Sequence, residues 1–165
     1  MEISTAARLV FGKAGNAAPA QRKGWAAPDE GHTWSVGPRA DLILTLAAGQ
    51  GDLLIELVLR PFMHPPLLVR QKVQVLVDEV PAGEAVVQDE SAVSFRVPAA
   101  QLAGKREIAV ALLCPQSVCP SDLGVSSDIR SLGFSFFELL AIWVPPEQPV
   151  YPRHLPPLPR SSQPC

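Results

Sequence analysis

Residues 40–47 read ADLILTLA, and residues 53–60 read LLIELVLR. Apolar side chains recur at every second position in both stretches, which is the period of an extended strand with one buried face. The residues that share this face are Leu42, Leu44 and Leu46 in the first stretch and Ile55, Leu57 and Leu59 in the second. The pattern therefore predicts two half-buried β-strands.

The same alternation continues along the chain. It recurs in QKVQVLVD (71–78), SAVSFRVP (91–98), REIAVALLC (106–114) and GFSFFELLAIWV (133–144), with shorter candidates in ARLVFGK (7–13) and AVVQ (85–88). Proline and glycine turns separate these stretches, and only AAQL (99–102) is typical of a helical turn. Short strands without intervening helices predict an all-β fold, an antiparallel β-sandwich of jelly-roll type with about eight strands, rather than a parallel α/β sheet.

The last of these stretches is ambiguous. Phe136, Leu139, Leu140 and Trp143 also fit the 3.6-residue repeat of a helix. The β-branched and aromatic content favours a strand, and the phase of its alternation slips around residues 137–139, as a β-bulge would cause.

Composition limits the classes of protein. A chain of 165 residues with 47% hydrophobic residues suits one domain with one core. The net charge is −2 and the basic residues are scattered singly, so we expect no nucleic-acid partner. No stretch approaches the roughly 18 apolar residues of a membrane span, and the first residues do not resemble a leader sequence. The expected location is therefore the cytoplasm.

The chain divides into a predicted β-sandwich domain, residues 1–144, and a proline-rich tail, residues 145–165, that is expected to be extended or disordered. The tail contains LPPLPR, whose P-x-x-P form fits aromatic-lined grooves of partner proteins. A linker, or a strap lying over the domain, is the alternative interpretation.

No pattern typical of a catalytic or metal site is present. The three histidines are dispersed, and Cys114 and Cys119 lack a second pair of ligands, so we expect no metal and no cofactor. The odd cysteine count also argues against a disulfide framework. Acidic pairs such as Asp29 with Glu30, or Glu79 with Glu84, keep a carbohydrate-active enzyme open as a hypothesis, which requires two carboxyls facing a cleft. We otherwise expect no catalytic residues.

Two segments differ from ordinary turns: GWAAPDEGHTWSVG (24–37) and CPSDLGVSSDIRSLGFSF (119–136). The first segment combines GW, a glutamate and WS before the first long strand, and the second contains PSDLGxSxDxRxLG before the last strand. Together the two segments resemble a jelly-roll accessory domain. Such domains occur beside bacterial glycosyltransferases and polysaccharide-biosynthesis proteins. The resemblance covers about residues 6–144. It implies a fold similar to carbohydrate-binding modules and a non-catalytic role, in which the domain contacts a glycan or positions a glycosyltransferase or polysaccharide-synthase component.

The two segments supply residue types that bind sugars. Aromatic faces stack on pyranose rings, while carboxylate and guanidinium groups bind hydroxyls. The candidate glycan-binding residues are Trp25, Glu30, Trp34, Asp128 and Arg130. The structural alternative has Trp34 closing one end of the sandwich while Glu30 or Asp128 pairs with Arg130 to tie the two loops together. Glycan contact predicts instead that Trp25 is exposed to solvent beside a concave face.

Two further kinds of partner remain open. A protein scaffold would act through the proline-rich tail and the sandwich surface without binding sugar. An exposed edge strand could pair two copies of the chain into a homo-oligomer.

Overall fold

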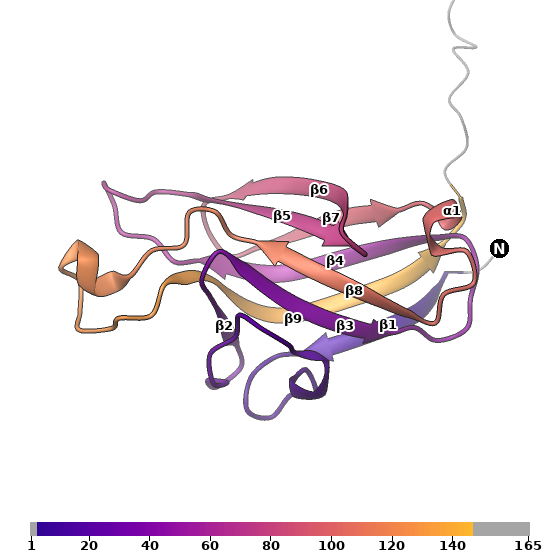
Figure 1. Ribbon diagram of the computed structural model, residues 1–165, viewed down its shortest axis with the longest axis horizontal. Helices are drawn as coiled ribbons and strands as arrows, with labels where there is room; N and C mark the ends of the chain where they lie inside the picture. The colour runs from indigo at the N-terminus through magenta and orange to yellow at the C-terminus, as the bar shows by residue number, and fades with distance from the viewer. Residues whose placement is uncertain (1–2, 147–165) are drawn as a thin grey trace, which may run out of the picture.

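The computed structural model describes residues 3–146, which form two packed antiparallel sheets (Figure 1). The strands are β1 (Ser4–Val10), β2 (Thr33–Val36), β3 (Arg39–Thr45), β4 (Asp52–Pro61), β5 (Gln71–Val77), β6 (Val80–Val87), β7 (Ser91–Val97), β8 (Glu107–Leu113) and β9 (Leu132–Val144). The helical turns are η1 (Ala18–Ala20), α1 (Ala99–Leu102) and η2 (Pro120–Leu123). The predicted helical turn at residues 99–102 is thus confirmed as α1.

The strand order is that of a jelly roll. Sheet A has the order β1-β9-β4-β7 with β2 added to β9, and sheet B has the order β3-β8-β5-β6. Without β2, every connection between consecutive strands crosses from one sheet to the other except the β5–β6 hairpin, which is the strand order of a jelly roll. The predicted fold class is confirmed, with one short strand more than the eight expected.

The core lies between the sheets and is built by the alternation seen in the sequence. In β3, β4 and β5 every second residue is buried and the residues between them keep part of their surface exposed. The largest fully buried side chains are Phe11, Phe134, Phe136, Leu42, Leu44, Leu53, Ile55, Leu57, Leu59, Ile108, Leu112 and Leu139. These apolar side chains drive the two sheets together by removing their surface from water.

The segment β9 is a strand, not a helix, and the predicted bulge is present. Along the β4–β9 ladder, Val58 pairs with Glu138 but the next residue, Leu59, pairs with Phe136. Phe137 is therefore an extra residue that β4 does not match, and the inward face of β9 resumes at Leu139.

Strand β2 lies inside a segment that the sequence predicted as a loop. It inverts the usual pattern, because the polar residues Thr33 and Ser35 are buried while Trp34 and Val36 are only half-buried. Since period-two patterns are recognised by apolar residues at buried positions, a four-residue strand with hydroxyls inside gives no such signal.

The sheet edges differ in how they are covered. Residues 21–23 follow the edge of β3 through the hydrogen bonds Arg22 N–H to Asp41 O and Asp41 N–H to Lys23 O. Strand β6 forms the other edge of sheet B, and strands β1 and β7 form the edges of sheet A, with β2 added to β9. Pairing of two copies at an exposed edge strand stays a prediction.

Most of the proline-rich tail, residues 147–165, lies outside the described residues. No helix within residues 3–146 has the length and apolar character needed to cross a membrane.

Candidate functional site

The outer face of sheet A, turned away from the core, carries Trp34. This tryptophan is paired with Ser135 of β9, and Ser135 is in turn paired with Arg60 of β4. Because cross-strand partners share a face, the three side chains form one row across the sheet on the side opposite Phe134 and Phe136. The sandwich-closing position expected for Trp34 is therefore not what the structure shows.

Trp25 occupies the position that was expected for Trp34. It bridges to Ser35, whose side chain faces the core, and its ring stacks on Phe11 at 5.3 Å and meets Phe136 edge-on at 5.4 Å. Its indole Nε1–H donates a 2.8 Å hydrogen bond to the carbonyl of Asp41. Trp25 thus seals the core between the sheets, and its ring does not project from the surface as a sugar platform would.

Four aromatic residues gather around the row of Trp34, and we call them the aromatic cluster: His32, Trp34, Phe62 and Phe137. The ring centroids lie 6.0 Å apart for His32 and Trp34, 5.6 Å for His32 and Phe137, and 6.3 Å for Trp34 and Phe62. All four side chains keep part of their surface exposed. The cluster comes from three chain segments that only the fold brings together.

An aliphatic strip continues from the aromatic cluster along the same face. Its residues are Leu54, Val58, Leu140 and Ile142, and all are half-buried. The ladder between β4 and β9 sets Leu54 opposite Ile142 and places Glu56 opposite Leu140. The outer face of sheet A is therefore apolar along its centre, with charged side chains interspersed.

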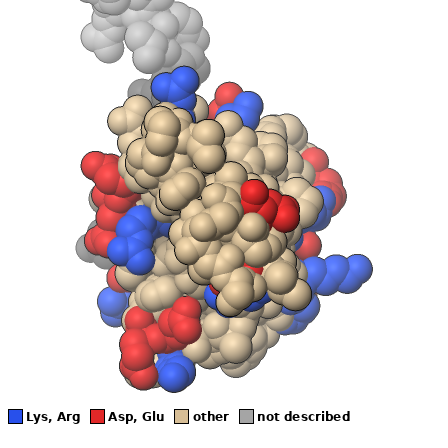
Figure 2. Space-filling model, turned by 90° about the vertical axis from the view of Figure 1, so that its left-hand side faces the viewer, with Lys and Arg blue, Asp and Glu red and all other residues tan. Residues whose placement is uncertain are grey.

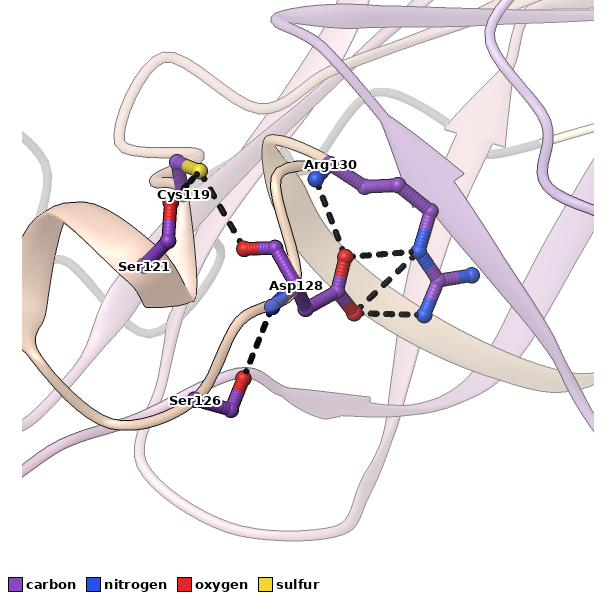
Figure 3. A network of polar contacts seen from close by, with 5 residues as sticks. All are labelled: Cys119, Ser121, Ser126, Asp128 and Arg130. Carbon is purple, nitrogen blue, oxygen red and sulfur yellow. Dashed lines mark hydrogen bonds and ion pairs between the residues drawn. The ribbon is translucent and has the colours of Figure 1, made fainter.

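The predicted pair Asp128 and Arg130 forms, but within its own loop (Figure 3). The guanidinium donates from Nε to Oδ1 at 3.0 Å and from Nη2 to Oδ2 at 2.7 Å, while the Arg130 backbone N–H donates to Oδ1 at 2.9 Å. Hydrogen bonds from the Arg130 side chain, and then from its backbone, hold the pKa of Asp128 at about 2. The pairing of Asp128 with Arg130 was expected, but it joins residues of one loop and does not itself link the two unusual segments.

The rest of this loop is tied in by small polar groups. The Cys119 thiol lies 3.0 Å from the Ser121 hydroxyl and donates to the Asp128 carbonyl at 3.3 Å, while Ser126 Oγ accepts from the Asp128 N–H (Figure 3). These contacts close a turn around η2. Cys119 is thus a hydrogen-bonded residue of a loop, and within residues 3–146 no group of three or more His, Cys, Asp or Glu side chains could hold a metal ion.

The two unusual segments do lie side by side. The Gly37 N–H donates to the Ser131 carbonyl at 2.7 Å, and Val36 pairs with Leu132. The pKa of Arg130 is raised first by its hydrogen bonds to Asp128, and the charge of Asp29 in the first segment adds a smaller effect. Glu30, by contrast, is exposed and lies 3.7 Å from Lys13, so it does not reach Arg130.

Of the five candidate residues, the structure therefore brings together Trp34 and the loop that holds Asp128 and Arg130. Trp25 and Glu30 lie elsewhere, in the core and in a surface ion pair. Sequence reasoning missed His32, Phe62, Phe137 and Arg60. Phe137 could have been found, because it is the residue at which the alternation slips and a bulge turns an extra side chain outward.

The acidic pairs considered for catalysis sit among basic partners. Glu79 binds Arg39, Glu84 lies 3.7 Å from Lys72, and Glu30 lies beside Lys13. Each of these carboxylates points toward a basic side chain at the surface, whereas a glycosidase site requires two carboxyls that face each other across a cleft. These pairs give no support to hydrolysis.

A hollow of about 420 Å³ lies near α1, at the end of the sandwich away from η2 (Figure 1). Its lining is mostly alanine and glycine, with Lys105, Arg106 and the edge of Trp143. The Trp143 ring is only 5% exposed, and its Nε1–H binds the Ala47 carbonyl. This hollow therefore presents no open aromatic face.

Comparisons with known proteins agree on the fold. No protein-family model matches the chain, and no curated protein matches it. Among solved structures it resembles a family GH115 4-O-methyl-alpha-glucuronidase with specificity for decorated arabinogalactans, with a TM-score of 0.54 and 9% identity over 87% of this chain. The chain spans only 18% of the length of that enzyme. At such low identity the likeness concerns the β-sandwich fold alone.

Two further likenesses are weaker. The chain resembles the CBM36-1 domain of a multidomain xylanase from the hindgut metagenome of Trinervitermes trinervoides, with a TM-score of 0.47 and 12% identity over 87% of this chain and 98% of that domain. It also resembles an acetyl xylan esterase from Butyrivibrio proteoclasticus, with a TM-score of 0.47 and 10% identity over 91% of this chain and 36% of the esterase. An association with glycosyltransferases is not shown.

Proposed function

We propose that this protein is a non-catalytic carbohydrate-binding protein and that the outer face of sheet A is its glycan-binding surface. The observation that carries the proposal is the placement of Trp34 and Phe137 on an open sheet face, where each keeps part of its ring exposed. Aromatic faces are the protein groups best suited to stack on the apolar faces of sugar rings. The flanking charged and polar side chains supply hydrogen bonds for hydroxyl groups.

The aliphatic strip extends the proposed surface along the sheet. A flat, elongated face fits a chain of several sugar units better than a single one, because successive units can lie along the strands. Since β4 and β9 are paired over ten residues of β4, the platform is rigid, and little ordering entropy is lost on binding.

Titration with a panel of polysaccharides tests this function. Of the three tryptophans, Trp34 is the one on the outer face of sheet A, because Trp25, although also half-buried, packs its ring against the core and Trp143 is 5% exposed. Wild-type protein should bind at least one glycan, and Trp34→Ala should weaken that binding at least about tenfold, the factor that corresponds to about 1.4 kcal/mol. The matched control is Leu76→Ala, which removes a half-buried apolar side chain from the outer face of sheet B.

The outcome of this titration is decisive in two ways. Equal losses of glycan affinity in Trp34→Ala and Leu76→Ala would place the glycan-binding site away from Trp34. A wild-type protein that binds no glycan of the panel would remove the proposed function.

In its finer form the proposal includes a cytoplasmic accessory role in bacterial polysaccharide biosynthesis, in which the glycan-binding face positions a glycosyltransferase on its product. This part rests on the resemblance of residues 24–37 and 119–136 to glycosyltransferase-associated domains. Co-expression with a bacterial polysaccharide synthase, followed by measurement of the product's chain length with wild-type protein and with Trp34→Ala, tests it. If the length of the polysaccharide product does not change, glycan binding by this protein has no role in synthesis.

A second candidate function is docking to a protein, and it is favoured by the end of the sandwich that carries η2. The exposed apolar residues there are Leu67 (69% exposed), Val69 (48%), Val125 (45%) and Ile129 (82%), from the loops after β4 and before β9. Figure 2 shows this end, where uncharged residues fill the centre and most charged side chains lie toward the margin. Exposed apolar patches of this kind are typical of protein contacts.

Charge substitution tests the second candidate. Leu67→Asp with Ile129→Asp should abolish co-purification with a biosynthetic partner and leave glycan binding unchanged. Deletion of residues 145–165 in the same assay reports separately on the proline-rich tail.

A further inference from the structure

We infer that the glycan bound by this face is acidic, and that Arg60 binds the carboxylate of a uronic acid unit whose ring lies on the aromatic cluster. The inference rests on the proposed function and specifies its ligand. It comes from the position of Arg60, from its lack of a carboxylate partner, and from unpaired polar atoms beside it.

Arg60 lies at the border of the aromatic cluster. It is paired through Ser135 with Trp34, and its guanidinium carbon lies 5.9 Å from the centroid of the Phe137 ring. A sugar ring stacked on this cluster would therefore place an exocyclic group within reach of a cation. The guanidinium offers a planar fork of donors that matches a carboxylate in bidentate fashion.

The other arginines on this face already have carboxylate partners. Arg8 donates to Glu138 at 2.9 Å, and Arg96 donates to the buried carboxylate of Asp52 at 2.7 Å. Arg60 is exposed and makes no ion pair with any residue in the described range 3–146. Its contact with the Phe137 ring is a cation–π interaction, which leaves the N–H donors at the edge of the guanidinium available.

The second observation is a set of polar atoms without partners at the same place. The Ser135 hydroxyl lies between Trp34 and Arg60, and it is fully buried. Neither its oxygen nor Nδ1 of His32, in the aromatic cluster, has a hydrogen-bond partner among residues 3–146. Unpaired buried polar groups cost free energy, and a polar ligand or a water bound beside them can supply the missing partner.

The acidic residues of this face leave room for an anion at Arg60. Glu138 is neutralised by Arg8. Glu56 is four residues from Arg60 on the same strand, which corresponds to about 13 Å at roughly 3.3 Å per residue. That separation exceeds the roughly 8 Å screening length at physiological salt, so Glu56 opposes an anion at Arg60 only weakly. In the neighbouring loops, the charges of Asp128 and Asp29 act on Arg130.

The test compares polyuronates with their methyl esters. Polygalacturonate, polyglucuronate and alginate are each titrated alongside the same polymer with its carboxyls esterified, so that only the charge differs. We expect the wild-type protein to bind at least one polyuronate about tenfold more tightly than its ester, and this preference should shrink between 50 and 500 mM NaCl. Arg60→Gln should abolish the preference and leave binding of the ester within about twofold.

Two more variants locate the effect. Arg60→Lys keeps the charge but loses the fork, and it should restore only part of the preference. Lys72→Gln removes a cation from the outer face of sheet B, and it should leave the preference unchanged because that face lies on the opposite side of the sandwich.

Equal affinity for acid and ester, or a preference that survives in Arg60→Gln, would overturn the inference. If Trp34→Ala still abolished binding in that case, the proposed function would stand with a neutral glycan as its ligand. If no polymer bound in any form, both would fail together.

Discussion

The side-chain hydroxyl of Ser35 accepts a 2.9 Å hydrogen bond from the backbone N–H of Phe134, a residue 99 positions further along the chain. Ser35 is fully buried, and its hydroxyl also lies 3.7 Å from the thiol of Cys114. The contact falls where the register between β2 and β9 shifts, between Trp34 and Val36. The Ser35 hydroxyl here replaces a backbone carbonyl as the acceptor for the Phe134 N–H, and this bond holds β2 with Trp34 facing outward.

Ser35→Ala should therefore destabilise the fold. The substitution leaves the Phe134 N–H buried without a partner, which costs about 1–3 kcal/mol of unfolding free energy. Urea denaturation followed by circular dichroism measures the loss.

The control for this substitution is Ser94→Ala on β7, where the side chain is exposed. Surface substitutions of this kind change stability by no more than about 0.5 kcal/mol. Equal midpoints for Ser35→Ala and Ser94→Ala would show that the buried hydrogen bond contributes nothing.

The thiols of Cys114 and Cys119 should differ sharply in reactivity. Burial raises the pKa of Cys114 to about 11, and the hydrogen bond with Ser35 offsets only part of that rise. Cys119 is half-buried in the loop around η2. Because the thiolate is the reactive form, iodoacetamide at pH 8 should label Cys119 at least about a hundredfold faster.

Mass spectrometry of the Cys165→Ser variant follows the two thiols without interference from the third. Full denaturation should equalise the two rates, which provides the internal control. Rapid labelling of Cys114 in the native state would mean that the space between β8 and β2 opens readily to solvent.

The strands could be predicted because their apolar residues alternate. Reliance on this alternation also explains why the placement of Trp25 and Trp34 was predicted wrongly. Trp25 and Trp34 are nine residues apart in one segment, and nothing in their local sequence says which one faces the core. The answer depends on pairing with β9, a strand about a hundred residues away, and on polar residues that fill the inward positions of β2. Non-local pairing of this kind is invisible to a period-two pattern.

The candidate site was predicted only in part for the same reason. Trp34, Asp128 and Arg130 were found because their segments looked unusual. Arg60 lies at the end of β4 and Phe62 directly follows that strand, in a stretch that looks like an ordinary strand followed by a turn. Only the register of β4 against β9 places Arg60 in the row of Trp34 and brings Phe62 close to the Trp34 ring.

The two tryptophans should respond differently to truncation. Trp25→Ala removes a ring packed between Phe11 and Phe136 together with the hydrogen bond to Asp41, and it should cost about 3 kcal/mol. Trp34→Ala removes a half-exposed ring from an open face, and it should cost no more than about 1 kcal/mol. Thermal or urea unfolding of both variants gives the comparison.

Fluorescence provides an independent readout of the same arrangement. Trp34→Phe should remove the component of the emission that iodide quenches most, whereas Trp25→Phe should leave it. The opposite result would mean that Trp25 faces solvent and that Trp34 seals the core.

Acid should loosen the loop between η2 and β9 through the carboxylate of Asp128. The folded-state pKa of Asp128, about 2, lies below its ordinary value of 3.8, so the ionised form is favoured by the folded loop. The stabilisation is therefore fully present above about pH 4 and is lost as the pH falls through about 2. Hydrogen exchange at the Arg130 amide, which donates to the Asp128 carboxylate, should accelerate over this window beyond the intrinsic pH dependence of exchange.

Two variants separate this carboxylate from the general effects of acid. Arg130→Gln removes the guanidinium hydrogen bonds to Asp128, and the pKa of the carboxyl measured by NMR should move up toward 3.8. Asp128→Asn removes the titrating group, so loop protection should be lower at neutral pH and should no longer fall with acid.

Because Asp128 sits in an exposed loop, its effect is local: the core strands should keep their exchange protection in both variants until the whole domain unfolds. A carboxyl that titrates at its ordinary pKa in the wild-type protein would show that the Asp128–Arg130 pair does not persist in solution.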